Sequence, residues 1–158
     1  REVLEKLLAD SGLEFTELFP CRTYVFLAAG HPLAERALIT LEDLAPYPCL
    51  SFDQGQSFYL AEEVYSTYHY RQVIKASDRA TLLNLMVGLD GYTLCSGILC
   101  EELNGDGYRA VPLDSDKIMH IGYVKRQGCV LSPLAKIYLE ELDRCNVNVL
   151  DHPAGPTR

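Results

Sequence analysis

The stretch from Lys75 to Leu103 has the clearest pattern of apolar and polar positions in the chain. Apolar residues recur at helical spacing from Leu82 to Leu89, which predicts a helix with one buried face. Ser77 and Asp78 lie at the expected N-cap of this helix, where their side-chain oxygens can accept hydrogen bonds from first-turn N–H groups. The Asp90-Gly91 pair predicts the turn that follows.

A short apolar segment, Tyr92–Cys95, follows this turn and is typical of a strand covered on both faces. Ser96-Gly97 then leads into Ile98, where we expect a second helix to begin. Two helix N-termini would therefore flank the carboxyl end of one strand, which is the edge where open α/β sheets bind ligands. Helix N-termini favour anions. The same pattern is also typical of a βαβ unit that binds nothing.

The remaining segments predict an alternation of short helices and strands, which indicates an α/β fold. Thr40 and Asp43 have the spacing of a helix capping box, and Pro46 stops that helix early. The other expected elements are a helix at 3–8, a strand from Phe15 continuing through 21–29, strands at 49–52, 70–76, 108–113 and 119–126, and helices at 58–68 and from Ser132-Pro133 to Cys145.

The composition is that of an ordinary globular chain, with 158 residues, 48% of them hydrophobic. The net charge of −8 argues against nucleic-acid binding by this segment itself. The six cysteines form no CxxC pair, so the sequence indicates neither a metal site nor a cofactor. We interpret them as small buried hydrophobes of a cytoplasmic protein, with redox sensing at Cys95 or Cys100 as an alternative. There is no signal peptide and no apolar run of bilayer length.

Several motifs occur in an order that resembles the effector-binding domain of LysR-type transcriptional regulators. They are His31-Pro32-Leu33-Ala34, ITLEDL at 39–44, Pro48 before a short strand, LLNLMVGLDGYTLCSG at 82–97, VPL at 111–113, and LSPLA at 131–135. The resemblance covers residues 12–144. It implies a periplasmic-binding-protein-like (type II) fold, in which two α/β lobes bind a small effector between them.

By this mapping, residues 1–30 and 114–145 belong to an incomplete first lobe, residues 31–113 form the second lobe, and residues 146–158 form a flexible tail. The family's helix-turn-helix would lie outside this chain. Two features depart from the common family pattern and lie near the expected cleft. They are Ser96-Gly97, where many members have a proline, and the stretch from Ser51 to Tyr70.

The resemblance favours an effector site built from two groups of residues. The first is the loop after the 49–52 strand, whose alternative interpretation is a solvated connection. The second gathers around the two expected helix starts, where Arg79 can pair with a carboxylate and Gly97 can let a ligand approach the backbone. Capping, packing or a surface ion pair are the alternatives. The predicted residues are Ser51, Phe52, Asp53, Gln54, Gly55, Arg79, Thr81, Ser96 and Gly97.

The function that follows is ligand sensing without enzymatic activity in a bacterial transcription regulator. The alternative is a solute-binding protein of the same fold that serves transport. The expected partners are a small effector, such as an organic anion or an amino acid, and further copies of the chain in a dimer or tetramer. DNA would be contacted only through the helix-turn-helix, and no membrane is involved. His31 and His120 have no metal-spaced partner and are interpreted as structural.

Overall fold

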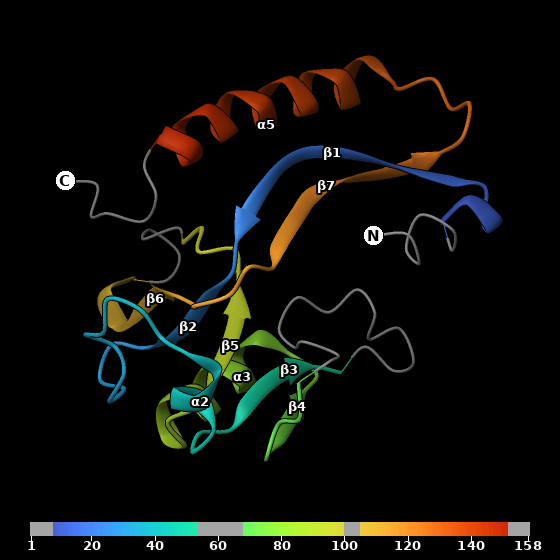
Figure 1. Ribbon diagram of the computed structural model, residues 1–158. Coiled ribbons are helices and arrows are strands. Elements are labelled where there is room, and N and C mark those ends of the chain that lie inside the picture. Colours follow the sequence, from blue (N-terminus) through green and yellow to red (C-terminus); the bar gives the residue numbers. More distant parts are fainter. Residues whose placement is uncertain (1–7, 54–67, 100–104, 152–158) are drawn as a thin grey trace. The chain divides into compact units, whose positions relative to one another are not determined.

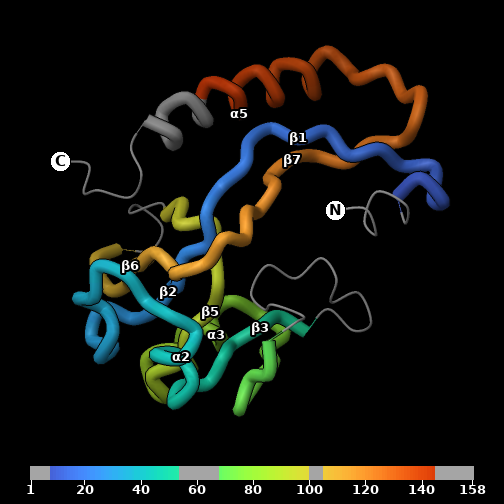
Figure 2. The backbone as a smooth tube through the Cα atoms, in the orientation of Figure 1, coloured from blue at the N-terminus to red at the C-terminus, as the bar shows by residue number. Residues whose placement is uncertain are grey.

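The computed structural model describes residues 8–53, 68–99 and 105–151, with side chains as far as residue 144. The chain divides into two compact units, which are Arg1–Cys21 with His120–Arg158 (unit 1) and Arg22–Met119 (unit 2). The backbone therefore passes from unit 1 into unit 2 and back once, as Figure 2 traces from β1 into β2 and from β6 into β7. The mixed α/β architecture that the sequence predicts is confirmed.

Unit 2 is built on a sheet in which five described strands follow the order β4-β3-β5-β2-β6 (Figure 1). Strand β3 pairs in parallel with both β4 and β5, while β2 runs antiparallel to β5 and β6. The strands are β2 (Tyr24–Ala28), β3 (Cys49–Phe52), β4 (Val73–Ala76), β5 (Tyr92–Cys95) and β6 (Tyr108–Pro112), and the helical elements are α2 (Leu41–Leu44), α3 (Arg79–Gly88) and the 3-10 turn η2 (Gly105–Gly107).

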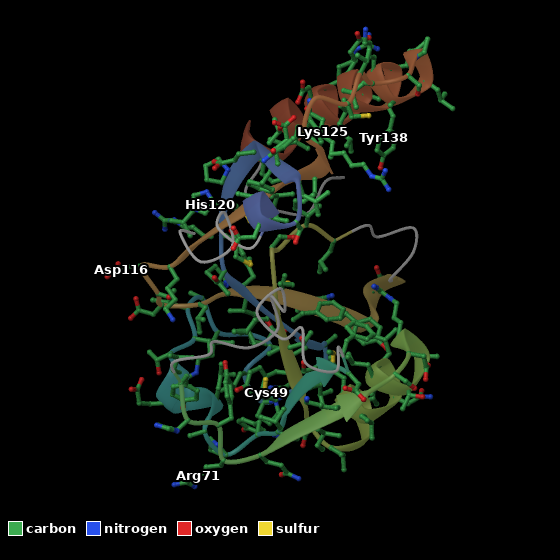
Figure 3. All side chains as sticks on the ribbon, turned by 90° about the vertical axis from the view of Figure 1, so that its right-hand side faces the viewer. Cys49, Arg71, Asp116, His120, Lys125 and Tyr138 are labelled. Carbon is green, nitrogen blue, oxygen red and sulfur yellow. The ribbon has the colours of Figure 1, made fainter. Side chains whose placement is uncertain are left out.

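Alternate residues of β2 enter two separate cores because successive side chains of a strand point to opposite faces of the sheet. Val25 and Leu27 pack with Leu44 of α2 on one face. Phe26 and Ala28 pack on the other face with the α3 residues Leu82 and Met86. The sheet of unit 2 is thus covered on both faces, which agrees with the near-continuous apolar character of β2, β3 and β5. Cys49 lies in this interior (Figure 3).

Helices α2 and α3 of unit 2 begin at the caps that the sequence predicts. At α2, the Thr40 hydroxyl accepts the Asp43 N–H at 3.2 Å, and the Asp43 carboxylate accepts the Thr40 N–H at 3.0 Å. These two bonds complete a capping box, which satisfies backbone groups that a helix end otherwise leaves unpaired. At α3, Asp78 is the N-cap, as expected.

Unit 1 contains the pair β1 (Leu13–Arg22) and β7 (Ile118–Arg126), together with helix α5 (Pro133–Asp151). The strands are antiparallel, because the Lys125 ammonium meets the Glu14 carboxylate at 2.7 Å while His120 meets Glu17 at 2.9 Å (Figure 3). Much of the apolar surface on α5 is exposed, and Tyr138 is 64% exposed. The helix therefore has an apolar face that the described residues leave uncovered.

Several sequence-based boundaries are wrong. The single strand expected from Phe15 to Ala29 is interrupted at Thr23, because its two halves belong to different sheets. Ile98 and Leu99, where we expected a second helix to begin, are not helical, and the rest of that expected helix, at 100–104, lies outside the described residues. Helix α5 continues past Cys145 to Asp151, where we expected a tail. The strand expected at 70–76 is confined to Val73–Ala76.

The predicted lobe boundaries at 30/31 and 113/114 fall inside unit 2. The reason is that β2, which precedes residue 31, pairs with both β5 and β6 at the centre of the unit 2 sheet. The assignment of the two units to the two lobes of a larger fold stays a prediction. Residues 1–7 and 152–158, and the helix expected at 58–68 up to residue 67, lie outside the described residues.

Candidate functional site

The carboxyl ends of the parallel strands β3, β4 and β5 meet at one edge of the unit 2 sheet. Phe52 lies beside Ala76 at the ends of β3 and β4, and the Asp53 N–H donates to the Ala76 carbonyl at 3.0 Å. Strand β5 is in register with β3 from Tyr92 beside Cys49, so both strands end three residues further on. Helix α3 begins at this edge, since it follows β4. We call this edge of the sheet the strand-end site, and it is formed by residues 51–53, 78–81 and 95–97.

The first group of predicted residues leads out of β3. Ser51 is buried, and its hydroxyl donates to the carbonyl of Phe52 at 3.3 Å. Phe52 is half-buried and packs against the α3-side core, while Asp53 is exposed. Gln54 and Gly55 lie outside the described residues. The polar group that this segment presents at the surface is therefore the Asp53 carboxylate.

The N-terminus of α3 is already occupied by its own cap. The Asp78 carboxylate accepts the Thr81 N–H at 2.9 Å and the Thr81 hydroxyl at 2.8 Å. These bonds hold the pKa of Asp78 below its ordinary value, with a smaller contribution from the Ala80 N–H. Thr81 thus donates to Asp78, and a negative charge lies where the helix N-terminus would otherwise attract an anion.

Arg79 is the first residue of α3 and is exposed. Its guanidinium carries a permanent charge that can pair with a carboxylate through two parallel hydrogen bonds. Together with Asp53 and Asp78, it gives the strand-end site charged groups of both signs. This arrangement can bind a ligand that carries both donor and acceptor groups.

Ser96 and Gly97 follow β5, but the structure explains the glycine by packing. Gly97 has φ +78°, a conformation that disfavours side chains, and its N–H donates to the Cys95 sulfur at 3.3 Å. A Cβ atom on Gly97 would lie 2.5 Å from Cδ2 of Tyr24. The space beside Gly97 is therefore filled by the Tyr24 ring. Ser96 is half-buried.

Tyr24 is a residue of this edge that sequence reasoning missed. It begins β2, which is antiparallel to β5, so its position beside Cys95 places it where β5 ends. A strand that starts at this edge carries no local sequence signal of its place in the sheet. Only the register of β2 on β5 could have identified Tyr24.

Metal-binding chemistry finds no support in the described part of the chain, where no group of three or more His, Cys, Asp or Glu side chains is arranged to hold a metal ion. None of the helices described there has the length and apolar character that crossing a bilayer requires. An edge of this kind is where open α/β sheets bind ligands.

Comparison with known proteins identifies the family. The model of the LysR substrate binding domain matches residues 3–145, so the chain belongs to this family. Its fold matches LysR substrate-binding domains of the type II periplasmic-binding-protein-like class, and the fold prediction is confirmed. The family consists of effector-binding domains of transcription regulators. A search of the curated proteins finds no match.

Several solved structures are similar to this chain. HinK, a LysR family transcriptional regulator from Pseudomonas aeruginosa, is 17% identical with a TM-score of 0.62, and the match covers 86% of this chain and 49% of the HinK chain. The effector-binding domain of QuiR in complex with shikimate is 15% identical with a TM-score of 0.58, and the match covers 88% of this chain and 68% of the QuiR chain. The reduced form of OxyR is 25% identical with a TM-score of 0.56, and the match covers 86% of this chain and 64% of the OxyR chain. This chain thus spans 49% of the length of HinK.

Proposed function

We propose that this chain senses a small polar effector at the strand-end site and transmits its binding to a DNA-binding helix-turn-helix in the whole protein, without enzymatic activity. The observation that carries the proposal is the convergence of three parallel strand ends and the start of α3 at one edge. Ligands bind at such edges in open α/β sheets. Family membership supports the regulatory role.

The charges at the site favour an effector with groups of both signs or with several hydroxyls. A carboxylate of the effector is expected to pair with Arg79, because Asp78 already accepts the Thr81 N–H of the α3 first turn. The Asp53 carboxylate and the Ser96 hydroxyl offer partners to the rest of the ligand. Amino acids and hydroxylated organic acids fit this pattern. Shikimate, the ligand of the QuiR domain, is one such acid.

The experiment is a thermal-shift screen of amino acids and hydroxylated organic acids on the full-length protein, followed by calorimetric titration of any ligand found. At a concentration one hundred times its Kd, a bound ligand should stabilise the protein by about 2.7 kcal/mol. Replacing Arg79 with Gln should weaken binding of a carboxylate ligand, and Ser96→Ala should cost about 1 kcal/mol, which is about a fivefold rise in Kd.

The matched control is Ser115→Ala, which removes a hydroxyl of unit 2 that accepts the Lys117 N–H, two residues further along the chain, at 3.2 Å. This variant should bind the ligand as the parent does. If Ser115→Ala and Ser96→Ala weaken binding equally, the strand-end site is not where the ligand lies. If no compound in the screen stabilises the protein, the sensing role is contradicted.

A further inference from the structure

His31 lies in the turn after β2 and is 4% exposed. Its ring joins two segments that are distant in the sequence. Nδ1 accepts the Leu33 N–H at 3.0 Å, and Nε2 lies 3.0 Å from the carbonyl oxygen of Asp90. The ring also packs on Tyr47, with the ring centroids 4.4 Å apart. A polar side chain at this depth therefore has a partner for each ring nitrogen.

These contacts allow one protonation state. Nδ1 faces an N–H donor, so it must be the unprotonated nitrogen, and Nε2 carries the hydrogen that is donated to Asp90. A proton added to Nδ1 would face the Leu33 N–H at the distance of a hydrogen bond. The two donors would repel each other, so the charged ring cannot keep both bonds.

The Asp90 carbonyl belongs to the turn that connects α3 to β5. The Leu89 N–H donates to Leu85, and the Gly91 N–H donates to Met86, so both residues still belong to the end of the helix. Asp90 itself has φ +50°, an unusual conformation for a residue with a side chain. Among the described side chains, His31 holds the Asp90 carbonyl, through the hydrogen bond from its Nε2.

We propose that His31 is a proton-sensitive latch, which fixes the α3–β5 turn to the 31–34 turn while its ring is neutral and releases it when the ring is protonated. The latch is a property of unit 2 alone and does not depend on the proposed effector. Its opening would free the C-terminal end of α3, the helix whose first turn belongs to the strand-end site.

The electrostatic surroundings set the direction of the response. Burial lowers the pKa of His31 below its ordinary value, and the Asp90 carbonyl and carboxylate oppose this effect. Asp90 is the charged group that faces the ring from the α3 side, and Tyr47 is the titratable group that faces it from the segment after α2. Because the unfolded chain binds the proton more readily, the latch stabilises unit 2 above about pH 6.5 and is lost as the pH falls below that value.

The test is nuclear magnetic resonance of the full-length ¹⁵N-labelled protein between pH 8 and pH 5. Two-bond ¹⁵N–¹H correlations should show the Nε2–H tautomer of His31 at pH 8. As the ring titrates, the Leu33 and Gly91 amide signals should shift with its midpoint. Their hydrogen-exchange protection, corrected for the intrinsic effect of pH, should fall by up to about tenfold per pH unit.

Two variants make the test specific. His31→Gln keeps an N–H donor for Asp90 but cannot titrate, so the Gly91 protection should become independent of pH. His120→Gln removes an exposed histidine of β7 and should leave the pH response as in the parent. The proposal is overturned if the parent shows no loss of Gly91 protection down to pH 5, or if the same loss occurs in His31→Gln. If His31→Gln fails to fold, the pH titration of the parent still tests the proposal, because Gly91 must lose protection with the same midpoint as the His31 ring.

Discussion

Replacement of Gly97 by alanine tests whether packing against Tyr24, rather than access for a ligand, requires glycine at the end of β5. The structure predicts two costs. Gly97 has φ +78°, where a side chain is strained whatever the surrounding space. The new Cβ would also lie 2.5 Å from Cδ2 and 2.7 Å from Cγ of Tyr24, which no side chain tolerates without movement.

The magnitudes add to a clear loss of stability. The left-handed conformation costs a residue with a side chain about 1–2 kcal/mol. Forcing a methyl group into filled space costs about 1–3 kcal/mol more. We therefore expect Gly97→Ala to lower the free energy of unfolding by about 2–5 kcal/mol, with or without an effector. A ligand-access role without the clash would leave only the conformational cost of about 1–2 kcal/mol in the ligand-free protein.

The chain offers a matched control in the same unit. Gly105 has φ +62° and nothing within 4 Å of the position of an added Cβ, so Gly105→Ala carries the conformational cost without the clash. Urea unfolding of both variants should show a larger loss for Gly97→Ala. In a Tyr24→Ala background, where the ring is absent, the cost of Gly97→Ala should fall to that of Gly105→Ala. If the two costs are equal in the parent, or additive with Tyr24→Ala, the packing explanation is refuted.

Three further predictions concern stability. Thr93→Val should raise the free energy of unfolding by about 1 kcal/mol in urea titrations, because the buried Thr93 hydroxyl has no hydrogen-bond partner among the described residues and its removal ends a desolvation cost. A loss of stability would show that the hydroxyl is satisfied. Thr40→Ala should lower the free energy of unfolding by about 1 kcal/mol through loss of the capping box. Thr40→Ser keeps a hydroxyl at the cap and should retain most of this stabilisation. Hydrogen bonds from Thr40 and Thr81 lower the pKa values of Asp43 and Asp78, so the stability that these two carboxylates contribute is present above about pH 4 and is lost as the pH falls further. Acid titration followed by circular dichroism should therefore show a smaller loss of stability over that range for Asp78→Asn than for the parent.

Helix starts could be predicted from the sequence because their causes are local. The Thr40–Asp43 capping box and the Asp78 cap each depend on residues three positions apart, so a short motif contains both partners. The core faces follow from the same kind of reasoning. Alternation along β2 assigns Val25 and Phe26 to opposite faces of the sheet, as the structure shows.

The break at Thr23 could not be predicted, because its cause lies elsewhere in the chain. No turn residue lies at the break itself, and the nearest proline, Pro20, lies inside β1 without ending it. The strand is divided because β1 pairs with β7, whereas β2 pairs with β5 and β6, and the Thr23 carbonyl accepts the Leu113 N–H at 3.1 Å. Strand partners this far away in the sequence, such as Cys95 and Pro112 beside Tyr24, leave no signal in a local pattern. The end of α5 was missed for a different reason, since polar residues after Cys145 weaken its apolar pattern without stopping the helix.

The same distinction between local and distant causes explains the candidate site. Residue type alone made Thr81 and Gly97 candidates for ligand contact, since a first-turn hydroxyl and a glycine corner often serve that role. In the structure Thr81 donates to Asp78, three residues away, and Gly97 packs on Tyr24, across the sheet. Arg79 and Asp53 are exposed and lie outside the two core clusters of unit 2, so their substitution should leave the core packing intact. An effect of these substitutions on effector binding should therefore be separable from an effect on folding.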